Sequence, residues 1–256
     1  MLPKWLQRMT WEEFELNLQR CGVVIIPVGS TEQHGAHLPL GTDTFIAKVL
    51  AEGASERTGA IIAPPIWYGW SAHHMVLPGT VTIRPEILAE LLFDVIGSLA
   101  HHGAKNFVII NGHRIVNIGW MQIACEKTQR TLGVKTVIFD PAYMSKEIVS
   151  KLGFGPVGHA EEIESSHMLH SYPELYHAER VLDYVPEPKP LFSADPRFQG
   201  DTLCYVPSTM EDMRKSVEVA KGTSGSPSRS CREKGKEYHE HLVERLVTVI
   251  NNMQEG

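Results

Sequence analysis

The apolar residues of this chain follow two kinds of pattern. Short, almost continuous apolar runs, rich in β-branched residues, occur at residues 23–28, 60–63, 106–110 and 135–139. Such runs are typical of strands that are buried on both faces, as in a parallel sheet. Longer segments with helical spacing of apolar residues separate them. This alternation predicts an α/β fold, a three-layer α/β/α sandwich with a mostly parallel sheet.

The helical segments carry recognisable start and stop signals. Thr10 and Glu13 have the spacing of a capping box, and the helix that they open is expected to end near Cys21 and Gly22. Pro85 and Gly103 stand where a first-turn proline and a C-terminal glycine belong. The predicted helices cover residues 10–21, 44–57, 85–103, 115–132, about 161–170 and 232–252.

Three segments lack a regular pattern. We expect residues 29–42 to form a loop after the first strand, and residues 67–84, rich in Trp, Tyr, His and Gly, to form a loop with room for one strand at 80–83. Residues 186–230 are richer in Pro, Ser and Gly, which predicts an irregular excursion or lid. Because no internal repeat divides the chain, residues 1–256 are interpreted as a single domain.

Composition narrows the class of protein. The chain is 43% hydrophobic and 21% charged, as expected of a globular protein with a large core. A net charge of −6 gives no attraction to nucleic acid or to an anionic membrane, so a small-molecule partner is favoured. The four cysteines form no CxxC pair, and the N-terminus lacks the apolar core of a signal peptide. We therefore expect reduced thiols and a cytoplasmic protein.

Residues that can do chemistry follow the predicted strands. In a parallel sheet the functional site lies at the carboxyl ends of the strands. The first run is followed by a loop with Glu32, His34 and Asp43, and the third by His113, whereas His159 and Glu164 precede or open a later helix. Carboxylates and neutral imidazoles bind divalent metals, and one carboxylate can bridge two ions. Any one histidine could be an ordinary loop residue, but their joint placement favours a composite metal site.

Three blocks of sequence resemble the creatininase family of metal-dependent amidohydrolases over nearly the whole chain: GSTEQHGAHLPLGTD at 29–43, NGH at 111–113 and HAEEIESS at 159–166. The resemblance implies two divalent ions per subunit, zinc or manganese. It implies that Glu32, Asp43 and His113 hold one ion, and that His34, Asp43 and Glu164 hold the other. It also implies that His159 passes a proton to the leaving group, and that the protein is a homo-oligomer, a hexamer in the best-known member.

The implied reaction is the hydrolysis of a C–N bond in a small cyclic amide by a metal-activated water, as in creatinine amidohydrolase. The alternative is the hydrolytic opening of an oxidised inositol ring at a C–C bond, with the same metal site. Two departures from the creatinine-hydrolysing enzyme bear on this choice. Ile115 stands where that enzyme has a glutamate ligand, and Gly155 stands where it has a tryptophan that encloses the substrate. Other relatives deformylate nucleotide-pathway intermediates or trim a peptide.

Several residues could shape the substrate pocket, although aromatic loop residues more often pack onto their own domain. The candidates are Trp67, Tyr68, Trp70, His73, His74 and Arg114. Glu161 and Glu162 are interpreted as first-turn helix residues, and His37, His101, His102, His167 and His170 as structural or solvent-facing. A protein that only binds metal would need no His159, and a dinucleotide-binding protein would need a GxGxxG motif, which no predicted strand carries.

Overall fold

A sheet of five parallel strands forms the centre of the computed structural model, which describes residues 1–155, 157–187 and 207–255. In spatial order the strands are β1 (Lys4–Trp5), β3 (Ile61–Ile62), β2 (Val23–Val28), β4 (Asn106–Asn111) and β5 (Lys135–Phe139). The predicted α/β fold with a parallel sheet is confirmed. The two-residue edge strand β1 was not predicted, because its length gives no alternation to recognise.

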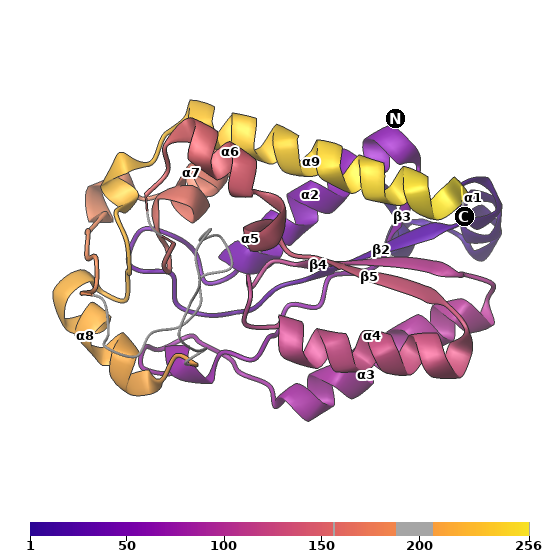
Figure 1. Ribbon diagram of the computed structural model, residues 1–256, viewed down its shortest axis with the longest axis horizontal. Helices are drawn as coiled ribbons and strands as arrows, with labels where there is room; N and C mark the ends of the chain where they lie inside the picture. The colour runs from indigo at the N-terminus through magenta and orange to yellow at the C-terminus, as the bar shows by residue number, and fades with distance from the viewer. Residues whose placement is uncertain (156, 188–206, 256) are drawn as a thin grey trace.

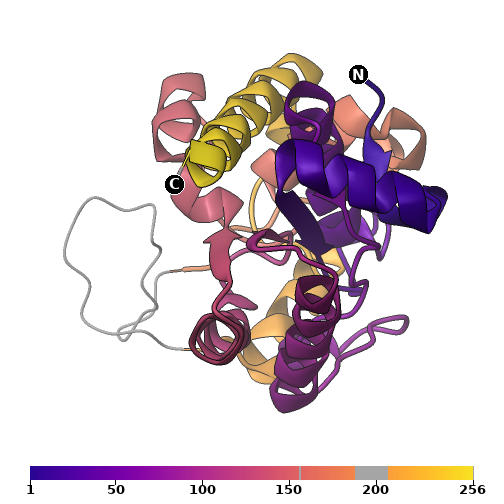
Figure 2. The ribbon, with the colours of Figure 1, turned by 90° about the vertical axis from the view of Figure 1, so that its right-hand side faces the viewer.

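Helices cover both faces of the sheet (Figures 1 and 2). Val23 and Ile25 of β2 belong to a hydrophobic core with residues of α2 (Thr42–Thr58) and α9 (Arg232–Glu255). Val24 and Ile26 belong to a second core with residues of α3 (Pro85–His101) and α4 (Ile118–Leu132). Successive residues of a strand point to opposite faces, so a strand between two helical layers has to be apolar throughout. All six residues of β2 are buried.

Local signals placed most helix ends correctly. Helix α1 (Trp11–Cys21) has the predicted capping box: the Thr10 hydroxyl accepts from the Glu13 backbone N–H, and the Glu13 carboxylate accepts from that of Thr10. Gly22 ends α1 with a φ of +73°, which glycine adopts without a steric cost. The remaining helices are α5 (Pro141–Met144), α6 (Lys146–Leu152), α7 (Glu162–Ser171) and α8 (Met210–Ala220), with 3₁₀ turns η1 (Leu6–Arg8), η2 (Ala72–His74), η3 (Pro173–Leu175), η4 (Ala178–Arg180) and η5 (Pro227–Arg229).

Helix α4 begins three residues later than predicted, at Ile118 instead of position 115. Ile115 has a φ of +69°, which no helix residue can adopt, and its backbone N–H donates to Asp140 Oδ2 at 2.7 Å. The strand predicted at 80–83 is also absent, since Val81 and Thr82 form only isolated bridges. In both places backbone contacts with distant segments override the local pattern.

The irregular excursion predicted at 186–230 is wrong for residues 210–220, which form α8. Thr209 and Asp212 make a capping box, and Met213, Ser216 and Ala220 are buried along one side of the helix. The Pro, Ser and Gly residues on both sides of α8 hid this short amphipathic segment. The part of the prediction that covers residues 188–206 lies outside the described residues.

Two further findings concern the described residues as a whole. Cys21 and Cys125 are buried free thiols, and Cys231 is a half-buried one. Over the same residues no helix combines the length and the apolar character that crossing a membrane would require.

Candidate metal centre

The candidate metal centre forms where β2 and β4 end against the first turn of α2. A Cβ atom at Gly112 would lie 2.0 Å from the carbonyl oxygen of Asp43, and one at Gly29 would lie 2.4 Å from the backbone nitrogen of Thr44. Only glycine permits such close approach of two backbones. The two glycines thus bring the loops after both strands together with Asp43.

Glu32, Asp43 and His113 form the first group of candidate ligands. His113 Nδ1 lies 3.2 Å from Glu32 Oε1 and 3.0 Å from Asp43 Oδ2, and all three residues are buried. Neither of these oxygens makes a hydrogen bond with the described residues. Ligand atoms that share one tetrahedral zinc ion, each about 2.0–2.1 Å from it, lie about 3.3 Å apart. The spacing of these three ligand atoms therefore fits one shared ion.

His34, Asp43 and Glu164 form the second group. The Nδ1–H of His34 donates to the backbone carbonyl of Glu32 at 3.1 Å, which turns Nε2 toward Asp43 Oδ1, also at 3.1 Å. Burial opposes protonation of His34, but the Asp43 carboxylate outweighs it and raises the pKa of His34 to about 9. A divalent ion would take the place of that proton on Nε2.

The two groups share Asp43. Within each group the ligand atoms lie within 4.8 Å of one another. Oδ2 of Asp43 faces His113 and Oδ1 faces His34. Buried carboxylates are costly unless a positive charge compensates them. The residues present thus fit divalent metal binding, and Asp43 belongs to both groups that the sequence resemblance implies.

Arg114 contacts Glu164. Its Nη2 donates to Glu164 Oε1 at 2.6 Å and to Glu161 Oε1 at 2.7 Å, and its side chain is 8% exposed. The other Glu164 oxygen accepts the backbone N–H of Ala160 at 2.7 Å. Glu161 caps α7 by accepting from the backbone N–H groups of Ile163 and Glu164. Arg114, expected near the substrate, is therefore paired with a candidate ligand and holds its carboxylate in place.

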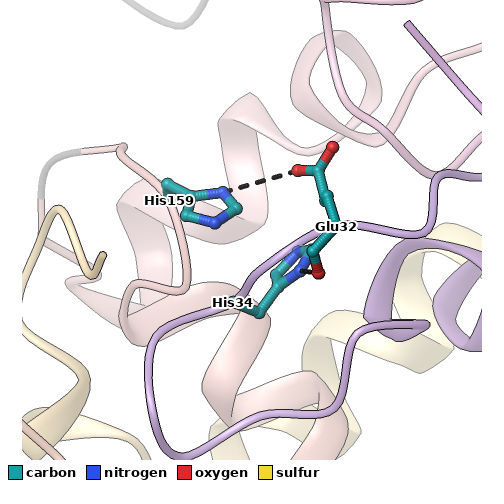
Figure 3. Close-up of side chains that lie close together, drawn as sticks. All are labelled: Glu32, His34 and His159. Carbon is teal, nitrogen blue, oxygen red and sulfur yellow. Dashed lines mark hydrogen bonds and ion pairs between the residues drawn. The ribbon is translucent and has the colours of Figure 1, made fainter. Parts of the chain in front are cut away.

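The ring of His159 lies between the backbone carbonyl of Gln33 and the carboxylate of Glu32. Its Nε2–H donates to the backbone carbonyl of Gln33, and its Nδ1 lies 3.7 Å from Glu32 Oε1 (Figure 3). Burial, assisted by the charge of His34, lowers the pKa of His159 to about 3. A neutral imidazole with its Nδ1 lone pair toward the carboxylates can accept a proton there.

His74, one of the residues predicted to shape the pocket, is buried beside the candidate ligands. It is 2% exposed, its Nε2 lies 3.2 Å from Glu32 Oε1, and its ring centroid lies 4.0 Å from that of His159. Its neighbours in the sequence are Trp, Tyr, Gly and a second His, which gave only a weak indication of a pocket. Gln33, by contrast, was not predicted; its side chain is buried, and its Nε2 lies 2.9 Å from His74 Nδ1.

The aromatic pocket candidates lie at the surface. Trp67, Tyr68 and Trp70 are 39%, 48% and 41% exposed. The Trp67 ring packs edge-on against Phe45, with centroids 5.6 Å apart, and the Thr31 hydroxyl donates to its backbone carbonyl. The half-buried His73 adjoins His74, with ring centroids 4.0 Å apart. A role of the three aromatic residues toward substrate stays a prediction.

Comparison with known proteins identifies the family. The model of the family described as "Creatininase: Creatinine amidohydrolase" matches residues 7–250. The chain belongs to the creatininase family. It is 30% identical to 3-dehydro-scyllo-inosose hydrolase of Thermotoga maritima, over 98% of this chain and 84% of that protein. It is 27% identical to creatinine amidohydrolase of Pseudomonas putida, over 94% of each. The creatininase-family chain is therefore a hydrolase.

Solved structures show the same relationship. A tryptophan-to-alanine mutant creatininase matches with a TM-score of 0.82 and 27% identity, over 99% of this chain and 100% of that one. A glutamate-to-glutamine mutant creatininase named as Zn-Zn type matches with a TM-score of 0.79 and 25% identity over the whole of both chains. A structure named creatininase Mn matches with a TM-score of 0.78 and 26% identity, over 99% and 100%. The predicted family and its α/β fold are confirmed.

Proposed function

We propose that this creatininase-family hydrolase uses two divalent ions to hydrolyse a bond in a small cyclic substrate. The observation that carries the proposal is the buried Asp43 carboxylate, whose two oxygens face two different groups of ligand atoms. Glu32 and His113 would complete one site, and His34 and Glu164 the other. Zinc and manganese suit this mixture of imidazole and carboxylate ligands, and relatives are named as zinc and manganese forms.

When bound, such ions lower the pKa of a water molecule and polarise a carbonyl group. The chain itself supplies proton transfer and orientation. The Gln33 carbonyl holds the Nε2–H of His159, so Nδ1 is the nitrogen that would accept the proton of the attacking water. The same proton then passes from Nδ1 to the leaving atom. Glu32, Asp43 and His34 are buried, which strengthens their electrostatic interactions with bound groups.

Two bonds are candidates for cleavage. The first is the C–N bond of a cyclic amide, as the name of the Pseudomonas putida relative implies. The second is a C–C bond beside the ketone of an oxidised inositol. The 30% identity with the inosose hydrolase over 98% of the chain favours the second. So do Ile115 and Gly155, which replace the glutamate and the tryptophan of the creatinine-hydrolysing enzyme.

The test begins with the purified protein and its metal content. Elemental analysis is expected to find two divalent ions per chain, and a chelator is expected to abolish turnover that zinc or manganese then restores. Creatinine, other cyclic amides and oxidised inositols are assayed in parallel, so the substrate that is consumed identifies the bond. Full turnover by a metal-free protein would contradict the proposal.

Assembly is a separate proposal. The family resemblance implies a homo-oligomer, and light scattering on the purified protein measures its mass directly. A mass of several 28.6 kDa chains supports the assembly. A monomer with full activity would show that the site is complete within one chain.

A further inference from the structure

The side chain of Gln33 determines which ring nitrogen of His74 carries the hydrogen. The backbone N–H of Gly35 donates to Gln33 Oε1 at 3.1 Å, so the other terminal atom of the amide is the nitrogen. That Nε2 donates to the backbone carbonyl of Gly222 at 3.4 Å and lies 2.9 Å from His74 Nδ1. Because an amide nitrogen can only donate, Nδ1 of His74 has to accept. A neutral His74 therefore carries its hydrogen on Nε2.

That Nε2–H faces the centre of the site. It lies 3.2 Å from Glu32 Oε1, yet neither carboxylate oxygen of Glu32 has a hydrogen-bond partner among the described residues. The Nε2–H of His74 thus lies beside Glu32 without an assigned hydrogen bond to it, so it can be donated to a bound molecule.

The backbone of Gln33 acts on the second imidazole. Its carbonyl accepts the Nε2–H of His159, so His159 presents the bare Nδ1 to the site. The rings of His74 and His159 lie 4.0 Å apart. Gln33 thus holds both imidazoles in the tautomer that carries hydrogen on Nε2. His74 turns its Nε2–H toward Glu32, whereas His159 turns its bare Nδ1 toward Glu32.

The surroundings of His74 keep this arrangement rigid. The hydroxyl of Thr80 donates to the backbone carbonyl of His74 at 3.0 Å and accepts the backbone N–H of Gln33 at 3.1 Å. A Cβ atom at Gly222, just after α8, would lie 2.1 Å from Gln33 Oε1. The chain leaves Gln33 little space to turn its amide, so the choice of tautomer is built into the fold.

We propose that Gln33 is a positioning residue and that His74 is a catalytic hydrogen-bond donor to the substrate oxygen that gains negative charge. The inference rests on the proposed hydrolytic function. As the water oxygen bonds to the substrate carbonyl carbon, its proton moves to His159 Nδ1 and an electron pair moves onto the carbonyl oxygen. That oxygen accepts the Nε2–H of His74 without proton transfer. When the C–N or C–C bond breaks, the leaving atom takes the bond's electron pair and the proton from His159.

The tautomer is tested without any substrate. Nitrogen-15 NMR of histidine-labelled, zinc-loaded protein distinguishes a bare ring nitrogen from one that carries hydrogen. The expected result is a bare Nδ1 on both His74 and His159 in the native chain. In Gln33→Met, which keeps the length but removes the donor, only His74 is expected to gain the other tautomer. A hydrogen on Nδ1 of native His74, or an unchanged His74 in Gln33→Met, would overturn the assignment.

The catalytic role is tested with two substitutions at one position. His74→Leu removes the donor and is expected to lower kcat by about 10²-fold, the usual cost of one such donor. His74→Gln keeps an N–H and is expected to recover at least about tenfold of that loss. Zinc content and KM are expected to stay near their native values. Equal losses in both variants, or a loss of zinc that matches the loss of kcat, would instead make His74 a support for Glu32.

The two proposals fail in different ways. If the native protein turns over none of the candidate substrates but shows the expected tautomers, the proposed function is wrong and the positioning by Gln33 stands. If turnover is observed but the tautomers differ, the positioning is wrong and the hydrolytic function stands.

Discussion

The protein has two clusters of histidines, and their difference shows what makes a metal centre. The site cluster consists of His34, His74, His113 and His159, and the second cluster, between α7 and α9, consists of His167, His170 and His239. In the second cluster His167 Nε2 lies 3.0 Å from His239 Nδ1. Among the described residues, three ligand atoms lie within 4.8 Å of one another only where histidines of the site cluster meet Glu32, Asp43 or Glu164.

Buried carboxylates account for the difference. In the site, burial opposes protonation of His113, but Glu32 and Asp43 outweigh it and raise its pKa well above the usual range. In the second cluster burial, assisted by the charge of His170, lowers the pKa of His239 to about 4. The site cluster can attract cations because buried carboxylates there require a compensating positive charge. The number of imidazoles alone does not distinguish it from the second cluster.

The largest expected effect comes from removing the shared carboxylate. Asp43→Asn leaves the shape of the side chain but removes its charge, so both ions are expected to be lost and kcat to fall at least about 10³-fold. His239→Asn is the matched change in the second cluster, and its kcat is expected to stay near the native value. Elemental analysis and turnover measure both. Two tightly bound ions in Asp43→Asn would refute the bridging role.

The next effect separates proton transfer from metal binding. His159→Gln is expected to lower kcat by about 10²–10⁴-fold while both ions remain, because the proposed function assigns His159 to proton transfer. Its own grouping with Glu32 and His34 does not include Asp43. His167→Gln, its counterpart in the second cluster, is expected to lower thermal stability without a comparable loss of kcat. Metal content and kcat are measured on the same samples. A His159→Gln protein that has lost an ion would place His159 among the ligands.

A smaller effect is expected from Arg114. Its guanidinium holds one Glu164 oxygen at 2.6 Å, so Arg114→Met should weaken the ion held by His34, Asp43 and Glu164 by about 10–100-fold. The ion held by Glu32, Asp43 and His113 should be affected less. Calorimetric titration of metal-free protein resolves the two affinities. Arg130→Met, which breaks an exposed pair with Glu126, is the control. Two equally weakened sites would show that Arg114 supports the loop as a whole.

The smallest effect is a pH dependence of stability from the second cluster. The pKa of His239 is about 4 in the folded chain, below the value of about 6.5 for an unfolded histidine. The unfolded state therefore binds more protons between these values, and folding stability falls as pH decreases from 6.5 toward 4. Replacing His239 by Gln should reduce the loss of Tm between pH 6.5 and pH 5 by about 2–4 °C. An unchanged pH profile would assign the decline to other groups.

The sequence determined the fold class and the chemical types in the site. Four apolar runs specified parallel strands because a strand covered by helices on both faces has no polar positions. The same patterns placed Glu32 and His113 just beyond strand ends, where a parallel sheet has its site. Helix α8 and the first turn of α4 were placed less well, because contacts with distant segments decide them.

Only the tertiary structure decided which atoms meet. Asp43 lies far along the chain from His113 and Glu164, and the close backbone approach at Gly112 brings His113 to it. The pairing of Arg114 with Glu164 and the tautomer that Gln33 imposes on His74 depend on contacts between residues many positions apart. Hydrophobic periodicity is a local property that a sequence displays directly, whereas hydrogen-bond partners and the orientation of an imidazole edge arise only when separate segments pack together.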